Sequence, residues 1–179
     1  MGNKKKVLAI CGSIRADSSN LQIIKLIAAM STNDLEIEIY NDLGKLPHFN
    51  PDDDSEYVDE IVKEFRNKIS TADGILISTP EYVFSLPGAL KNAIEWTVST
   101  TVFSGKPVAI ITASGLGEKA HESLLLIMKT IEAKFDEQSQ VLISGAKSKI
   151  NADGVIKDND TLKKIGNVVN AFIKNMRNE

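Results

Sequence analysis

A run of short polar side chains follows the first apolar segment of the sequence. Val7–Cys11 is apolar throughout, and positions 12–20 then read Gly-Ser-Ile-Arg-Ala-Asp-Ser-Ser-Asn. The first turn of a helix has unpaired backbone N–H groups and a partial positive charge, so it binds anions readily. A plain helix cap needs one hydroxyl or amide side chain, whereas four stand here together with a guanidinium. The run therefore predicts a phosphate site whose donors are Ser13, Arg15, Ser18, Ser19 and Asn20.

The glycine spacing excludes two common phosphate motifs. The nucleoside-triphosphate loop requires Gly-x-x-x-x-Gly-Lys-Ser/Thr, and this run has no lysine. The dinucleotide fingerprint Gly-x-Gly-x-x-Gly fails as well, because Ile14 and Asp17 stand at its second and third glycine positions. A pyrophosphate needs bare backbone to approach it, whereas hydroxyl groups suit a terminal monophosphate held from several sides. Flavin mononucleotide (FMN) carries a phosphate of this kind.

Apolar runs and helical repeats alternate along the chain. We expect strands at Val7–Cys11, Leu35–Tyr40, Gly74–Ser78, Val108–Thr112 and Gln140–Ser144. We expect helices behind the cap near position 20 and over about 58–69, 87–99, 119–134 and 160–176, with a turn at 151–154. Continuous apolar strands are typical of a parallel sheet covered on both faces, and the alternation in Leu35–Tyr40 indicates an edge strand. The pattern predicts a single α/β domain over 1–179 with strand order 2-1-3-4-5.

In such a sheet, ligands bind at the carboxyl ends of the strands where the strand order reverses. The loops at that rim are 12–20, 79–86 and 113–117. In the second loop, prolines flank Tyr82 and Phe84, so the loop is stiff enough to border a flat heteroaromatic ring. The alternative is that these two aromatic side chains close the core. In the third loop, Ser114-Gly115-Leu116-Gly117 could let backbone amides approach the far edge of the ring, or its two glycines could form only a turn.

Three residues near the rim have more than one interpretation. Glu81 could act as a general base, as a solvated surface charge, or as an anchor that accepts backbone donors, which we favour. Cys11 stands beside the predicted phosphate, where a redox role competes with the commoner role of a small buried residue. His48 could face a substrate opening or belong to the surface.

Composition narrows the class of protein. The chain has 179 residues, 42% hydrophobic and 25% charged, with a net charge of −3, which argues against nucleic acid as a partner. Its lone cysteine excludes an internal disulfide and suits the cytoplasm. No apolar stretch predicts a membrane span or follows the basic N-terminus as in a signal peptide. The two histidines lack the spacing of metal ligands, so we expect no metal site.

Two long motifs resemble the NADPH-dependent FMN reductase family. They are Gly12-Ser13-Ile14-Arg15 with Ser18 and Asn20, and Pro80-Glu81-Tyr82 with Ser85-x-Pro87-Gly88-x-Leu90-Lys91-Asn92-Ala93-Ile94-Glu95-Trp96. The resemblance implies a flavodoxin-like three-layer sandwich and relatives that reduce quinones, azo dyes and chromate. It implies that FMN binds at Ser13, Arg15, Ser18, Ser19, Asn20, Pro80, Glu81, Tyr82, Val83, Ser114 and Gly115. Val83 departs from the Asn that many relatives have.

The resemblance also implies a reaction in which the flavin itself carries the chemistry. Hydride would pass from NADPH or NADH to FMN, and the electrons then to a quinone, azo compound, flavin or metal oxyanion. The family usually forms homo-oligomers, so we expect a homodimer or homotetramer with the aromatic loop and Trp96 as candidate contacts. The alternative for Trp96 is a packing role. The rival interpretation is a flavodoxin-type electron carrier that does not oxidise NAD(P)H itself.

Overall fold

The computed structural model describes residues 3–150 and 156–177 and has the predicted five-stranded parallel sheet. Its strands are β1 (Lys5–Cys11), β2 (Leu35–Tyr40), β3 (Gly74–Thr79), β4 (Val108–Ser114) and β5 (Gln140–Ser144). They pair in the order β2-β1-β3-β4-β5, which confirms the predicted topology. Every residue of β3 is buried because the strand lies in the middle of the sheet, whereas β2 at the edge alternates between buried and exposed positions.

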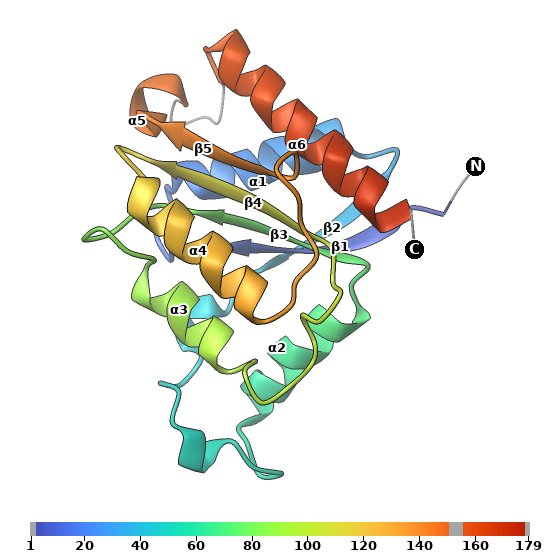
Figure 1. Cartoon of the computed structure of the whole chain (residues 1–179), viewed down its shortest axis with the longest axis vertical. Coiled ribbons are helices and arrows are strands. Elements are labelled where there is room, and N and C mark those ends of the chain that lie inside the picture. Colours follow the sequence, from blue (N-terminus) through green and yellow to red (C-terminus); the bar gives the residue numbers. More distant parts are fainter. Residues whose placement is uncertain (1–2, 151–155, 178–179) are drawn as a thin grey trace.

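Helices cover both faces of the sheet (Figure 1). They are α1 (Ser19–Met30), α2 (Glu60–Thr71), α3 (Gly88–Glu95), α4 (Glu118–Thr130), α5 (Ala146–Lys149) and α6 (Asn159–Arg177). One apolar core lies between the sheet and α2, α3 and α4, and includes Phe65, Leu90 and Leu124. The other lies against α1 and α6, and includes Ile24 and Ile165. The result is the three-layer arrangement expected of a flavodoxin-like fold.

Several predicted boundaries need correction. Helix α3 ends at Glu95 rather than near position 99, because the chain continues from there in turns. Helix α4 ends at Thr130 rather than near 134, just before Glu132 takes a left-handed backbone conformation (φ 62°). The four-residue helix α5 and the short 3₁₀ helices Leu43–Lys45 and Pro51–Asp53 were not predicted, since they are too short to show periodicity. The expected turn at 151–154 lies outside the described residues.

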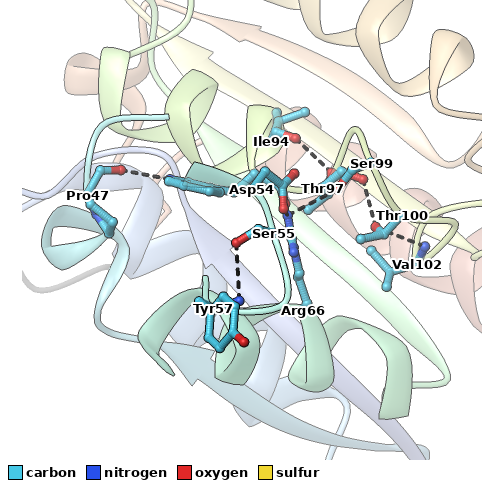
Figure 2. Close-up of polar contacts among 11 residues, drawn as sticks. Pro47, Asp54, Ser55, Tyr57, Arg66, Ile94, Thr97, Ser99, Thr100 and Val102 are labelled. Carbon is cyan, nitrogen blue, oxygen red and sulfur yellow. Dashed lines mark hydrogen bonds and ion pairs between the residues drawn. The ribbon is translucent and has the colours of Figure 1, made fainter. Parts of the chain in front are cut away.

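The segment that joins β2 to α2 is fixed against α2 and α3. Arg66 of α2 donates from Nε to the carbonyl of Trp96 (2.6 Å) and from Nη2 to Asp54 Oδ1 (2.8 Å), as Figure 2 shows for the Asp54 contact. Trp96 donates from Nε1 to the carbonyl of Pro47 (2.7 Å) and is 1% exposed. The expectation that Trp96 lies at a subunit contact is therefore wrong, because its ring fills the core.

Candidate functional site

A cavity of about 610 Å³ lies at the carboxyl ends of β1, β3, β4 and β5. Its walls come from four segments and consist of Ser13, Arg15, Asp17, Ser18, Ser19, Asn20, Pro80, Glu81, Tyr82, Ala113, Ser114, Gly115, Gly145, Ala146, Lys147 and Ser148. The cavity brings together every residue that the sequence predicts for cofactor binding except Val83. Its fourth wall, 145–148, was missed.

The hydroxyl-rich segment after β1 forms the wall beside the start of α1. Ser18 is the N-cap of α1, and its Oγ accepts a hydrogen bond from the backbone N–H of Asn20 (3.3 Å). Ser13 Oγ lies 3.1 Å from the Tyr82 hydroxyl, so the first and second loops meet across the cavity. Gly12 lets the end of β1 pass close to Thr79 at the end of β3, because a Cβ at Gly12 would lie 2.2 Å from Thr79 Oγ1.

Asn20 connects this wall to the sheet. Its side chain is 2% exposed, donates from Nδ2 to the carbonyl of Ala113 (3.0 Å) and accepts at Oδ1 from Ser78 Oγ (2.9 Å). These bonds hold the first turn of α1 against β3 and β4. Asn20 lines the cavity as predicted, but its amide is engaged by the protein, and a long-range tie of this kind leaves no pattern in the sequence.

Glu81 anchors the second loop to the start of α4. Its Oε1 accepts from the N–H of Gly117 (3.3 Å), and its Oε2 accepts from Lys119 (2.9 Å) and Ala120 (3.0 Å). Gly117, the N-cap, offers no side chain of its own, so a carboxylate from another loop serves the unpaired donors and the positive end of the helix. The favoured interpretation of Glu81 as an anchor for backbone donors is confirmed.

The tip of the second loop is a tight hairpin turn. Tyr82 and Ser85 exchange two backbone hydrogen bonds of 3.0 Å, while Val83 (φ 51°) and Phe84 (φ 55°) both adopt left-handed conformations. Such a turn normally uses Asn and Gly, and a β-branched residue is strained there. Val83 is 96% exposed and is absent from the cavity walls, and Phe84 is 69% exposed, so neither closes the core.

The third and fourth walls are joined to each other. The N–H of Gly145 donates to the carbonyl of Gly115 (2.9 Å), and Ser144 Oγ donates to the carbonyl of Leu116 (2.8 Å). A Cβ at Gly115 would meet no atom within 4 Å, so bare backbone faces open space, as the approach of a flat ring requires. The only sequence signal for the fourth wall is the glycine, lysine and serine within the four residues that follow the last strand.

The structure shows the surroundings of Cys11 and of the two histidines, His48 and His121. Cys11 is buried, and burial raises the pKa of its thiol, so the residue is a neutral packing group with Ser18 Oγ 3.9 Å away. His48 is exposed. His121 lies between Thr112 Oγ1 (2.9 Å) and Gln140 Oε1 (2.6 Å), and burial lowers its pKa. In the described part of the chain, no three acidic, histidine or cysteine side chains group as metal ligands.

The cavity fits FMN in size and chemistry. Its volume falls within the roughly 300–1,000 Å³ typical of ligand sites. The segment after β1 brings hydroxyls, an arginine and a helix N-terminus to the walls, and these groups suit a phosphate monoester. The Tyr82 ring and the bare backbone at Gly115 stand where a flat ring system would lie. Within the described residues, no helix is long and apolar enough to cross a membrane.

Fold and cavity define a flavodoxin-like flavoprotein, and comparison with known proteins narrows the class further. The family model for NADPH-dependent FMN reductase matches residues 5–148, and the chain belongs to this family. It is 35% identical over 164 residues to the 2-hydroxy-1,4-benzoquinone reductase of a Burkholderia species, with 88% of each chain covered. It is 33% identical over 163 residues to an NAD(P)H-dependent FMN reductase of Pseudomonas aeruginosa, again with 88% of each covered.

The fold matches a solved flavoenzyme over nearly its whole length. The structure of an NAD(P)H:(acceptor) oxidoreductase from Paracoccus denitrificans superposes with a TM-score of 0.78 at 28% identity, covering 97% of this chain and 98% of that one. The predicted family, fold class and cofactors are confirmed. The protein is an FMN-dependent oxidoreductase that uses NAD(P)H and acts on quinone-type acceptors.

Proposed function

We propose that residues 1–179 form one FMN-binding domain whose described cavity holds the flavin and that it works by alternation. The observation that carries this proposal is the meeting of four sequence-distant segments around one cavity, with the hydroxyl-rich segment and the aromatic loop in contact through Ser13 and Tyr82. When bound, FMN accepts hydride from NAD(P)H and passes the electrons to a second substrate. The protein binds and orients the flavin and shields it from water.

Each wall has its own part in this assignment. Ser13, Arg15, Ser18 and Ser19 donate to the phosphate, and Asn20 holds the start of α1 in position for them. Pro80 and Tyr82 border the isoalloxazine ring, and Ser114 and Gly115 border its far edge. Glu81 acts through its hold on α4 rather than as a proton donor, since three backbone N–H groups occupy its carboxylate.

Val83 contributes the shape of its turn rather than a polar contact. Asn tolerates the left-handed conformation far better than Val, so the Asn that the family resemblance implies at this position would suit the backbone found here. We therefore assign Val83 to the lip of the site. Together with Ile14, Phe84 and Leu116, all more than 60% exposed, it makes that lip apolar.

An apolar lip favours a flat, weakly polar electron acceptor, and we propose a quinone as the class that fits it best. The names of the Burkholderia relative and of quinone reductases from Pseudomonas putida and Escherichia coli agree with this choice. For the nicotinamide substrate we expect little preference between NADPH and NADH. The cation next to the third loop, Lys119, is paired with Glu122 (2.8 Å), which leaves less charge for a 2′-phosphate.

The same apolar lip supports assembly as a homodimer or homotetramer, because exposed apolar groups that cluster on one rim often mark an interface. Light scattering coupled to size exclusion tests this, and a monomer at micromolar concentration would contradict it. The need for NAD(P)H and the single buried thiol support a place in the cytoplasm.

The deciding experiment is reconstitution. Purified protein is incubated with FMN, desalted and examined for a bound-flavin absorbance spectrum, then mixed with NADH or NADPH and a benzoquinone. Bound flavin together with steady NAD(P)H oxidation is the expected result. Bound flavin without NAD(P)H oxidation would favour the electron-carrier alternative, and failure to bind flavin would refute both.

A further inference from the structure

Lys147 is the one cation in the fourth wall of the cavity. The lining includes two basic side chains, Arg15 and Lys147, and two acidic ones, Asp17 and Glu81. Without Lys147 the walls would carry an excess of negative charge, although the phosphate of FMN is itself close to a dianion at neutral pH.

The segment that carries Lys147 and the start of α1 are both tied to the end of β4. The Asn20 side chain at the start of α1 donates to the carbonyl of Ala113 (3.0 Å), and the N–H of Gly145 before α5 donates to the carbonyl of Gly115 (2.9 Å). These two acceptors are two residues apart in the chain, at the end of β4 and just beyond it, so the two segments are fixed to adjoining positions on the rim of the cavity that both of them line.

The backbone of α5 is fixed while the Lys147 side chain stays available. Ala146 and Ile150 are buried in the same apolar core as Ile23 and Ile24 of α1, so α5 and α1 lie on the same face of the sheet (Figure 1). Lys147 between them is exposed, and its ammonium has no hydrogen bond or ion pair within the described residues. By contrast, Lys119 and Lys91 are paired with glutamates on their own helices.

We propose that Lys147 is a second cation, besides Arg15, for the phosphate monoester of FMN. This assignment rests on the proposed function. It makes the fourth wall part of the phosphate site, so that the group is held by hydroxyls and a helix start on one side and by an ammonium on the other. The contact is electrostatic, since lysine acts on phosphate as a point charge.

The test compares FMN with riboflavin, which lacks the phosphate. Dissociation constants are measured by flavin fluorescence quenching for the wild type, Lys147→Gln, Lys147→Arg and the matched control Lys149→Gln, which removes a charge two residues away and outside the cavity walls. We expect Lys147→Gln to weaken FMN on the order of tenfold at low salt, as the loss of one nearby charge near a surface predicts. The affinity of Lys147→Gln for riboflavin should equal that of the wild type, and Lys147→Arg should bind FMN like the wild type. At 0.5 M salt, the difference in FMN affinity between the wild type and Lys147→Gln should become smaller.

Several results would overturn the assignment. One is FMN affinity within twofold of the wild type in Lys147→Gln. Others are equal losses for FMN and riboflavin, or equal losses in Lys147→Gln and Lys149→Gln, which would indicate a structural or a general charge effect. A change in NADPH affinity alone would show that Lys147 contacts the 2′-phosphate of NADPH instead of the phosphate of FMN, and would refute the proposal. Wild-type protein that binds neither flavin would refute the proposed function itself. If the wild type and Lys147→Gln bind FMN equally well, only the role of Lys147 is refuted.

Discussion

Replacing Glu81 by alanine is expected to loosen the start of α4 and to destabilise the protein before any effect on activity is considered. The carboxylate accepts three backbone hydrogen bonds, from Gly117, Lys119 and Ala120, at a helix start whose N-cap is glycine. Its removal leaves the exposed N–H of Lys119 to water, whereas Gly117 and Ala120 are buried and their N–H groups lose an acceptor that water replaces only in part. Loss of an N-cap lowers the free energy of unfolding by about 0.5–2 kcal/mol, and a hydrogen bond to a charged group contributes about 1.5–3 kcal/mol.

We therefore expect Glu81→Ala to lower the free energy of unfolding by about 1–3 kcal/mol, since water replaces part of what is lost. For a chain of this size that corresponds to a fall in Tm of roughly 3–10 °C. The assay is thermal and urea unfolding of the flavin-free protein, which separates the anchor from any contact with the cofactor.

The matched control is Glu122→Ala on the same helix. Glu122 forms an exposed ion pair with Lys119 (2.8 Å), and such pairs contribute little, so its loss should cost less than about 0.5 kcal/mol. Equal stability of Glu81→Ala and the wild type would refute the anchor, as would equal losses in the two variants.

Three further predictions concern residues away from that anchor. Val83→Asn should raise the free energy of unfolding by about 1 kcal/mol in urea, because Asn tolerates a left-handed backbone; a loss would show that the turn is not strained. Tyr40→Phe should be neutral or stabilising by up to about 1 kcal/mol, since the buried hydroxyl has no partner among the described residues, and burial raises the pKa of Tyr40 to about 12. His121, whose pKa burial lowers, binds its proton more weakly in the folded protein than in the unfolded chain. The free energy of unfolding therefore falls as the pH drops below about 6.5. In urea titrations, the fall between pH 7.5 and pH 5 should be smaller for His121→Gln than for the wild type.

Sequence patterns predicted the sheet well because its strands are buried on both faces. A continuous apolar run such as Val7–Cys11 is typical of a strand that is covered on both faces. The alternation of Leu35–Tyr40 identified the edge strand correctly. The rim loops followed from topology alone, since the carboxyl ends of parallel strands meet at one edge. That is why residues from three distant loops could be placed in one cavity.

The parts that escaped prediction are those decided by backbone conformation or by long-range contacts. Val83-Phe84 has none of the Asn-Gly signal of a left-handed turn, so only the structure reveals the hairpin. Helix α5 is four residues long and has no period to detect. The ties from Asn20 to Ala113 and from Gly145 to Gly115 join residues that nothing in the sequence marks as neighbours.

The motif around Asn92 and Trp96 shows how a family resemblance can be specific without reporting a binding residue. Asn92 accepts from the N–H of Phe49 (2.8 Å) and donates to the carbonyl of Pro47 (2.9 Å), which also accepts from Trp96 Nε1 (2.7 Å). Neither side chain lines the cavity. Both instead hold the segment after β2 against α3.

That segment comes close to the rim of the cavity at Gly44. A Cβ added at Gly44 would lie 3.3 Å from Cγ2 of Ile14, which stands in the loop after β1. The position of Ile14 therefore depends on the segment after β2, which Asn92 and Trp96 hold through Pro47. We infer that the α3 motif supports the rim of the cavity from a distance. Selection for a flavin site would then act on these residues through packing and hydrogen bonds rather than through contact with the flavin.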